Sequence, residues 1–240
     1  IYTLDSGSSY TVVVTRYGYV GQKKTFTAGE ANKTIQIKLE KAPDSTLKDI
    51  ELPTDWPLFR KNDENNGVVD VRTPITAEDT VLVWANKLGE GYSGSAVGSP
   101  IIVGGYLYTY SGTTIMKVDK ETGLILKTGT MVGGSSFAIN SATYAEGMIF
   151  IGLANGRVQA FNAETLESLW VYQDALGGQP NCPIAYADGY IYTGFWNSET
   201  KQANFACLSV TDEDATKTNE AKLPTWTYTH NGFYWAGAYV

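Results

Sequence analysis

Few side chains in this sequence of 240 residues could carry out catalysis or bind a metal ion. It contains one histidine, His230, and two cysteines, Cys182 and Cys207. His230 precedes Asn231 and Gly232, a pair typical of turns, and no motif places a nucleophile beside it. We therefore interpret His230 as a solvated turn residue, and a single histidine excludes the common zinc sites.

Two acidic runs carry the carboxylate oxygens that Ca²⁺ prefers, namely Asp63-Glu-Asn-Asn-Gly67 and Asp212-Glu-Asp214. Neither run has the complete ligand set of a calcium loop, which ends in a bidentate glutamate. We interpret both as solvated surface residues and expect no metal. The glycine pairs at 89–91 and 133–134 are not followed by a helical pattern, so they are turn glycines and not phosphate-binding loops.

Aromatic rings next to amide side chains are the best candidates for ligand binding, because this combination suits the recognition of sugars or peptides. The alternative is that these residues only pack loops and line a wet channel. Which of the two holds depends on the elements that position them. The candidate residues are Tyr92, Asn140, Asn181, Trp196, Tyr234 and Trp235.

The composition favours a folded protein made of strands and turns. Apolar residues make up 43% of the chain, which is enough for a sizeable core. The 25 glycines and the aromatic residues (16 Tyr, 8 Phe and 6 Trp) favour strands joined by tight turns. The net charge of −7 argues against nucleic acid or an anionic membrane as partner. No apolar run approaches the ~20 residues that cross a bilayer, so we expect no direct membrane insertion.

The first part of the chain alternates apolar and polar residues. Strands are expected at residues 10–15, 24–27 and 34–39, with glycines between them. Three or four strands bury too little surface to stand alone, so residues 1–41 are expected to be a partial β-sandwich. The string Tyr10-Thr-Val-Val-Val-Thr-Arg-Tyr-Gly-Tyr19 resembles small Ig-like modules of bacterial surface proteins.

A connector follows at residues 42–80, because its prolines interrupt both helical and strand patterns. Trp56, Leu58 and Phe59 are expected to pin it to a neighbouring surface, since a free linker seldom carries such apolar residues. Residues 81–240 form the third part of the predicted domain organisation.

A repeat organises this third part. Gly105-Tyr-Leu-Tyr108, Gly147-Met-Ile-Phe150 and Gly189-Tyr-Ile-Tyr192 share one pattern, and their glycines are 42 residues apart. A tryptophan marks the fourth strand of most copies, at Trp84, Trp170 and Trp226, and Leu126 replaces it in one copy. The wider spacing before Trp226 predicts an insertion at residues 211–223. Four short strands per ~40–45 residues are typical of a propeller blade.

The repeats resemble those of pyrroloquinoline-quinone-type (PQQ-like) β-propellers. Val158-Gln-Ala-Phe-Asn-Ala-Glu-Thr-Leu-Glu-Ser-Leu-Trp170 and Lys117-Val-Asp-Lys-Glu-Thr-Gly123 are similar to the repeat of that family, and Asp188-Gly-Tyr-Ile-Tyr-Thr-Gly194 is similar to its second strand. The resemblance implies that each tryptophan docks against a glycine peptide of the neighbouring blade. With an outer strand at 81–88 and an opening strand at 233–240, the fold class is an all-β, incomplete propeller of about 3.5 four-stranded blades.

Enzymes of the resembled family hold a quinone on the propeller axis with Ca²⁺, a catalytic aspartate and a bridged pair of adjacent cysteines. Cys182 and Cys207 are not adjacent, and two strand spacings put them ~9–10 Å apart, too far for a disulfide. We interpret both cysteines as small apolar fillers and expect no cofactor.

The sequence thus predicts a non-catalytic recognition, adhesion or scaffolding module of a bacterial cell-surface or secreted protein. Its expected partner is a protein or glycan ligand at the propeller face, and its expected location is extracellular or at the cell surface. The alternative is a quinone-dependent dehydrogenase whose catalytic residues lie outside this chain, and a third possibility is an accessory domain for carbohydrate binding. The step from fold to role is an association only.

Overall fold

The computed structural model describes residues 4–14, 19–20, 22–29, 34–41, 55–62, 65, 67–69, 73–89, 97–135 and 140–240. The chain divides into two compact units. One unit comprises Ile1–Leu52 and Asp70–Ala85, and the other comprises Pro53–Val69 and Asn86–Val240. The predicted connector at residues 42–80 therefore contributes to both units.

The first unit contains two short antiparallel strand pairs. β1 (Ser9–Val14) pairs with β3 (Gln22–Thr27), and β2 (Tyr19–Val20) pairs with β4 (Glu40–Lys41). The strands expected at 10–15 and 24–27 are confirmed. The strand expected at 34–39 is wrong, because these residues alternate in exposure but pair with no described neighbour, and a strand needs a hydrogen-bonded ladder. A single 3-10 turn, η1 (Ala77–Asp79), completes the described elements of this unit.

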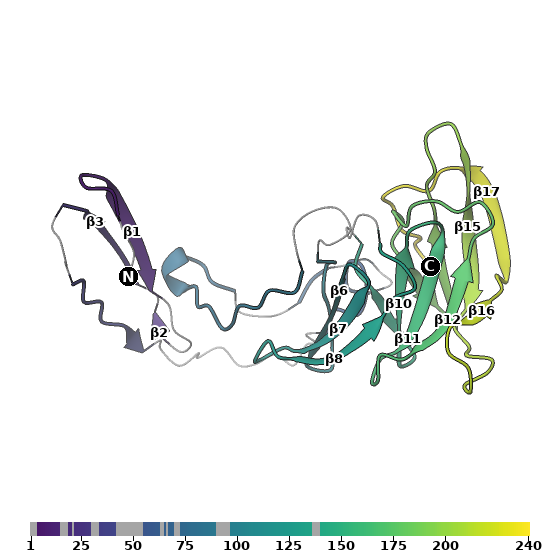
Figure 1. Ribbon diagram of the computed structural model, residues 1–240, viewed down its shortest axis with the longest axis horizontal. Coiled ribbons are helices and arrows are strands. Elements are labelled where there is room, and N and C mark those ends of the chain that lie inside the picture. Colours follow the sequence, from purple (N-terminus) through teal and green to yellow (C-terminus); the bar gives the residue numbers. More distant parts are fainter. Residues whose placement is uncertain are drawn as a thin grey trace. The chain divides into compact units, whose positions relative to one another are not determined.

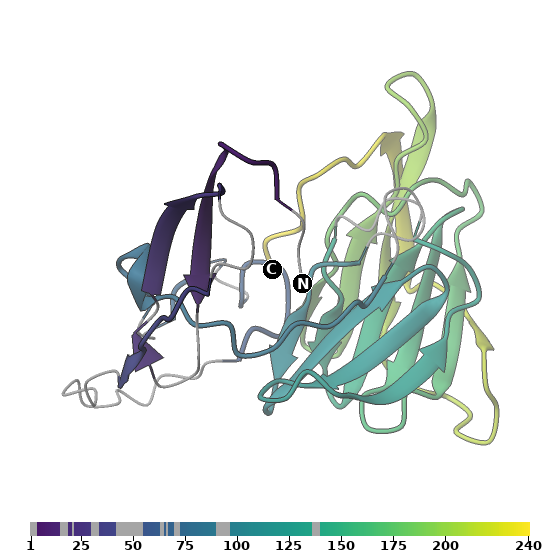
Figure 2. The ribbon, with the colours of Figure 1, turned by 60° about the vertical axis from the view of Figure 1, so that its left-hand side comes forward.

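The second unit contains three sheets that stand side by side in chain order (Figures 1 and 2). The first sheet is β5 (Ile101–Val103), β6 (Tyr106–Ser111), β7 (Thr114–Asp119) and β8 (Ile125–Thr130). The middle sheet is β9 (Thr143–Ala145), β10 (Met148–Leu153), β11 (Arg157–Asn162), β12 (Ser168–Gln173) and β16 (Glu220–Lys222). The third sheet is β13 (Ala185–Ala187), β14 (Tyr190–Gly194), β15 (Gln202–Ser209) and β17 (Trp226–Asn231).

In each sheet the first four strands form an antiparallel meander, and the innermost strands β5, β9 and β13 are spatial neighbours. This arrangement confirms the prediction of an all-β, incomplete propeller, with the sheets as its blades. No described helix is long and apolar enough to span a bilayer.

The first hairpin of every sheet is made by the predicted glycine. Gly105, Gly147 and Gly189 have φ values of +85°, +77° and +82°, and the residue before each also has a positive φ. Two consecutive positive φ values define the type I′ turn, whose twist matches that of the flanking strands. The three glycines therefore occupy matching places in successive sheets, as the 42-residue spacing predicts.

The turn between the third and fourth strands has the same form in the first and middle sheets, because a side-chain oxygen accepts hydrogen bonds from the turn backbone in both. Asp119 Oδ1 accepts bonds from the backbone N–H groups of Glu121 and Thr122, at 3.0 and 2.8 Å. Asn162 replaces the aspartate in the middle sheet, and its Oδ1 accepts from Glu164 and Thr165 in the same way. An amide oxygen is a sufficient acceptor, so this departure from the repeat leaves the turn intact.

Two segments that the sequence analysis predicts as strands are not strands. Residues 81–88 and 233–240 have no ladder with another described segment. Single contacts hold the second of them, such as the bonds from Phe233 N to Phe195 O at 3.0 Å and from Trp235 N to Asn181 O at 3.2 Å. The described residues of the second unit therefore form three sheets and no further half blade.

The insertion expected at residues 211–223 is confirmed, and it contains a strand that crosses to the neighbouring sheet. β16 lies parallel to β12, with Trp170 opposite Glu220, Val171 opposite Ala221 and Tyr172 opposite Lys222. The middle sheet thereby gains a fifth strand from the segment that joins β15 to β17.

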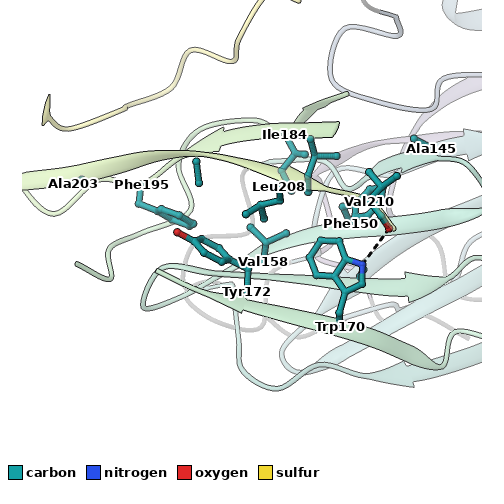
Figure 3. Packing of buried hydrophobic residues seen from close by; sticks show 13 residues of the cluster. Ala145, Phe150, Val158, Trp170, Tyr172, Ile184, Phe195, Ala203, Leu208 and Val210 are labelled. Carbon is teal, nitrogen blue, oxygen red and sulfur yellow. Dashed lines mark hydrogen bonds between the residues drawn. The ribbon is translucent and has the colours of Figure 1, made fainter. Parts of the chain in front are cut away.

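The largest core lies between the middle and third sheets (Figure 3). At its centre Trp170 is fully buried, and its indole Nε1 donates to the backbone oxygen of Val210 at 3.3 Å. Docking of the tryptophan against the next blade is thus confirmed, but the acceptor belongs to Val210 and not to a glycine peptide. The cluster comprises Ala145, Phe150, Val158, Ala160, Trp170, Tyr172, Ile184, Ile191, Phe195, Ala203, Ala206, Leu208 and Val210.

At the junction of the first and middle sheets a tyrosine replaces the tryptophan. Leu126, which holds the tryptophan position in sequence, is 45% exposed and makes no such contact. Instead, Tyr108 donates its hydroxyl to the backbone oxygen of Ala163 at 3.0 Å. Ala163 and Val210 are equivalent, since their N–H groups bond to the turn glycines Gly147 and Gly189. Both junctions therefore use one aromatic donor to the same backbone position.

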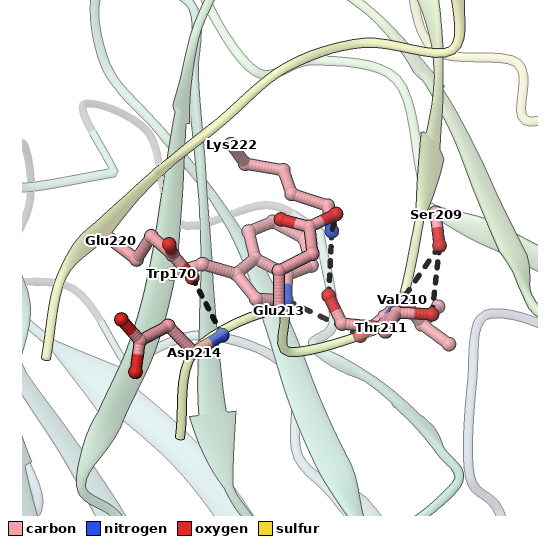
Figure 4. Close-up of polar contacts among 8 residues, drawn as sticks. All are labelled: Trp170, Ser209, Val210, Thr211, Glu213, Asp214, Glu220 and Lys222. Carbon is pink, nitrogen blue, oxygen red and sulfur yellow. Dashed lines mark hydrogen bonds and ion pairs between the residues drawn. The ribbon is translucent and has the colours of Figure 1, made fainter. Parts of the chain in front are cut away.

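A buried lysine accompanies the aromatic donor at each junction. Lys117 Nζ lies 4.2 Å from the ring centre of Tyr106 and pairs with Glu164 of the middle sheet at 2.8 Å. Lys222 Nζ lies 5.3 Å from the ring centre of Trp170 and pairs with Glu213 at 2.7 Å (Figure 4). Each buried ammonium group therefore contacts an aromatic ring and a carboxylate, and these contacts compensate for the water that it loses on burial.

Candidate ligand-binding face

Three of the predicted site residues meet in one aromatic group, here called the aromatic trio: Trp196, Tyr234 and Trp235. The ring centres of Trp196 and Tyr234 are 4.9 Å apart, and those of Tyr234 and Trp235 are 4.8 Å apart, edge to face. Trp235 is 53% exposed and Tyr234 is 45% exposed. Paired rings with open faces suit contact with an apolar or planar group of a partner.

Backbone contacts hold the trio in place. Trp196 and Gln179 exchange two backbone hydrogen bonds, at 2.8 and 3.0 Å. Gly232 has a φ of +55°, and a Cβ there would lie 2.8 Å from the Trp196 ring, so only glycine fits this turn. Trp235 itself has a φ of +67°, an unusual value for a bulky residue. The rings are therefore held by the fold around them.

The two predicted amide residues, Asn140 and Asn181, form hydrogen bonds inside the protein. Asn181 is almost fully buried, and its Nδ2 donates to Gln179 Oε1 at 3.3 Å. Asn140 Nδ2 donates to the backbone oxygen of Pro180 at 2.6 Å. Asn181 is next to the trio through its backbone oxygen, which accepts from Trp235 N, but the side-chain amides of both residues bond inside the protein and are not presented beside the exposed rings. Tyr92 lies outside the described residues.

His230 does not lie in a turn, which corrects the sequence-based interpretation. It is part of β17, is exposed, and its ring stacks with Tyr228 at 6.2 Å and an interplanar angle of 8°. The turn begins two residues later at Gly232, because the strand pairs through Asn231 with Gln202 of β15.

The cysteines are buried and free; Cys207 lies on β15, and Cys182 precedes β13. Burial raises the pKa of the Cys182 thiol to about 11, and burial also raises that of Cys207. Cys182 Sγ lies 2.9 Å from the backbone oxygen of Ala236. A thiol that stays protonated is a poor nucleophile and a poor metal ligand, as expected for an apolar filler.

Two residues of the acidic run at 212–214 form ion pairs, although the sequence predicts only solvated surface residues there. Glu213 pairs with the buried Lys222, and Asp214 pairs with Lys217 at 2.6 Å. The run at 63–64 lies outside the described residues. Within the described part, no group of three or more His, Cys, Asp or Glu side chains is arranged to hold a metal ion.

The inner edges of two sheets are bonded by the connector. Trp56 exchanges two backbone bonds with Ile102 of β5, at 2.7 and 3.0 Å. The backbone oxygen of Pro57 accepts from Tyr144 of β9 at 2.8 Å. The Asp55 carboxylate accepts from Gly104 N, and Leu58 is buried, as its apolar character predicts. Among the described residues, the connector backbone thus follows the inner strands β5 and β9.

Asp174 is a buried carboxylate that no sequence pattern marks. It accepts bonds from the hydroxyl of Tyr172 at 2.7 Å, from Asn204 Nδ2 at 3.0 Å and from Leu176 N at 2.8 Å. Burial, together with the bond to this carboxylate, raises the pKa of Tyr172. Asn204 is 30 residues away in sequence, so no local pattern could reveal the contact. With its acceptors filled internally, Asp174 stabilises the fold.

An open apolar groove of about 660 Å³ also lies on the third sheet. It is missed by sequence reasoning because its residues come from β15, β17 and the segment after β17. Phe205 and Trp226 stack at 6.3 Å, and Phe205 contacts Phe233 at 5.2 Å. The lining residues are Phe205, Trp226, Thr227, Tyr228, Phe233, Ala236, Gly237 and Ala238.

Comparison with known families gives a match over residues 70–199, to the family described as outer membrane protein assembly factor BamB. This match covers more than half of the chain. No curated protein matches the chain significantly.

Solved structures with a similar fold include two dehydrogenases. A europium-containing methanol dehydrogenase is 17% identical with a TM-score of 0.50, over 76% of this chain and 33% of that protein. A quinohemoprotein alcohol dehydrogenase from Comamonas testosteroni is 17% identical with a TM-score of 0.56, over 73% and 27%. BamB from Moraxella catarrhalis is 20% identical with a TM-score of 0.42, over 56% and 35%. The chain thus spans about a third of these proteins, and the likeness concerns the fold alone.

Proposed function

Because this chain belongs to the family described as outer membrane protein assembly factor BamB, we propose that it is a non-catalytic scaffold that binds a protein partner in the bacterial envelope. The aromatic trio is the proposed contact surface. Exposed tryptophan and tyrosine rings held by a rigid backbone are the residues that most often carry binding energy at protein interfaces.

The exposure of the trio is the observation that carries this proposal. Two of its three rings are about half exposed although each contacts another ring, and backbone bonds hold all three in place. Rigid rings lose little conformational entropy when a partner covers them. A glycan remains the second candidate ligand, since stacked rings also suit sugars.

The wider setting is proposed on the same basis. The family description supports a location in the bacterial envelope. Within the envelope, we propose a position at the cell surface or outside the cell. Residues 1–41 as an Ig-like module, 42–80 as a linker and 81–240 as the propeller part remain the proposed domain organisation. The connector along β5 and β9 supports a role without a quinone cofactor.

Site-specific photo-crosslinking tests the proposed contact. A photoreactive amino acid in place of Trp235 should give a defined protein adduct in cells of the native host. A matched control replaces Leu126, which is 45% exposed on the first sheet, and should give none. Adducts of equal yield from both positions would contradict a specific site at the trio.

Two further measurements separate the other candidates. A glycan array with the whole chain and with Trp235→Ala should show no specific signal, and a signal lost in the variant would favour the sugar ligand. Titration of the full-length protein with quinone and Ca²⁺ should give neither stoichiometric uptake nor alcohol-dependent dye reduction. Both together would overturn the non-catalytic role.

A further inference from the structure

The three sheets protect their outer edges differently. The last strand of each antiparallel meander is its fourth strand, namely β8, β12 or β17. Backbone N–H and C=O groups on an open edge can pair with another chain, so natural edges carry lysine or proline or are covered. β8 carries Lys127 near its middle, and β12 is covered by β16.

β17 has none of these protections. Its six residues, Trp-Thr-Tyr-Thr-His-Asn, include no lysine, proline or carboxylate, and all of them are exposed. Among the described residues no strand pairs with its outer edge. Tryptophan, tyrosine and threonine are also strong strand formers, so the edge is long, extended and free to accept a partner.

The pairing registers show that β17 and β12 are equivalent. Tyr172 opposes Val158 of β11, and Tyr228 opposes Phe205 of β15, at matching places in the two sheets. Trp226 precedes Tyr228 by two residues, just as Trp170 precedes Tyr172. The edge covered in the middle sheet and the open edge in the third sheet thus present the same aromatic pair.

β16 shows what this type of edge accepts. It runs parallel to β12, and its Lys222 places Nζ over the Trp170 ring. The Lys222 side chain is almost completely buried there, and Nζ also donates to the backbone oxygen of Thr211 at 2.6 Å. A tryptophan at this position therefore receives a cation from the added strand.

We propose that β17 binds an extended segment of a partner protein, which adds to the third sheet as a parallel fifth strand and places a lysine or arginine over Trp226. The chain's net charge of −7 favours a basic segment. Backbone pairing supplies the affinity, and the cation over the ring supplies the specificity. The aromatic trio is a different surface, so either proposal can fail without the other.

A fluorescent peptide tests the edge on the complete chain. The probe is Thr-Val-Thr-Ala-Lys-Val-Thr, which keeps the Ala-Lys pair of β16 between strand-forming residues. We expect saturable binding by fluorescence anisotropy. Thr227→Lys on β17 should weaken it about tenfold or more, because an edge lysine blocks strand addition and repels the probe. Thr128→Lys, at the equivalent place on β8, should leave the affinity unchanged, since Met116 opposes Thr128 as Ala206 opposes Thr227.

A second arm requires no protein variant. Lysine-to-glutamate replacement in the peptide should weaken binding severalfold through loss of the cation–ring contact. A spin label at the peptide's N-terminus should broaden the NMR signals of Trp226 more than those of Asn231, as a parallel strand requires. Equal affinity of both peptides, an antiparallel label pattern, or unchanged binding to Thr227→Lys would overturn the proposal. Self-association of the chain that Thr227→Lys abolishes, without peptide binding, would identify a second copy as the occupant and also overturn it.

Discussion

At the scale of single residues, Trp170 and Tyr108 perform the same task with different chemistry. The indole N–H of Trp170 and the hydroxyl of Tyr108 each donate a hydrogen bond to the next sheet. The acceptor is the backbone oxygen of the residue that follows the third strand of that sheet. The repeat pattern identified Trp170, because tryptophan recurs at a fixed spacing. Tyr108 escaped notice, because it lies on a different strand from Leu126, the residue it replaces.

Replacement of Trp170 by phenylalanine should reduce the free energy of unfolding by about 2 kcal/mol, since the Val210 oxygen loses its donor and a void forms. Trp226→Phe is the matched control at the equivalent position, where the ring is 46% exposed, and should cost less than about 0.5 kcal/mol. Urea unfolding followed by circular dichroism measures both, and equal losses would contradict the assigned contact.

The pair of Lys117 and Glu164 makes stability depend on pH. The bond from Lys117 holds the pKa of Glu164 below its ordinary value of 4.5. Desolvation by burial works to lower the pKa of Lys117, but Glu164 and Tyr108 outweigh it, so the net pKa is raised above 10.5. A lowered carboxyl pKa adds stability above pH 4.5, and this stability is lost as the pH falls through the folded value. A raised lysine pKa adds stability below pH 10.5, lost as the pH rises.

Glu164→Gln should therefore destabilise the protein at neutral pH, and its difference from the wild type should shrink as the pH falls below 4.5. The control is Glu199→Gln, which makes the same replacement of a carboxylate by an amide at an exposed position. Denaturant unfolding across a pH series measures the difference. A pH-independent difference would show that the pair is not ionic.

At the scale of elements, the type I′ turns and the crossing strand β16 differ in how they can be recognised. Each turn is local, since a glycine with positive φ is required wherever two strands join through two residues. β16 is only three residues long and has no apolar alternation. Its pairing depends on Lys222 reaching the Trp170 ring and Glu213, which no short window of sequence contains.

Lys222→Ala should release β16 from the middle sheet, because the buried ammonium anchors that strand between ring, carboxylate and carbonyl. Hydrogen exchange of the β12 amides should become faster, and the loss of stability should be about 1–3 kcal/mol. Lys217→Ala removes an exposed lysine from the same insertion and should leave β12 protected. Unchanged exchange in Lys222→Ala would contradict the anchoring role.

At the scale of the whole molecule, the connector belongs partly to the second unit. Pro53–Val69 groups with the sheets, and Trp56 bonds to β5 while Pro57 bonds to β9. The apolar residues of the connector predicted attachment to some surface. That the surface is the inner edge of two sheets depends on strands more than 40 residues further along the chain.

Trp56→Ala should therefore destabilise the second unit by about 2 kcal/mol and leave the first unit unchanged. Amide exchange should become faster at Ile102 and Tyr144 but not in β1 or β3. Leu4→Ala, an exposed position of the first unit, should alter neither inner strand. Faster exchange in β1 and β3 as well would mean that the two units unfold together.

The candidate site was partly within reach of sequence reasoning. Trp196, Tyr234 and Trp235 were named because aromatic residues in loops between repeats are conspicuous. Their mutual contact, and the inward bonding of Asn140 and Asn181, depend on the path of the chain after β17. His230 was misplaced, because an Asn-Gly pair marks a turn but not the residue at which the preceding strand ends.

The period of 42 residues, the turn glycines and the alternation of apolar side chains determined by themselves that this chain folds into successive four-stranded sheets. These are local requirements of backbone geometry and of burying one face of a strand. Only the tertiary structure decided which tyrosine replaces a missing tryptophan, where the connector lies, and which edge β16 covers. Each of these contacts joins segments 40 or more residues apart, and its energy exists only once the sheets are assembled.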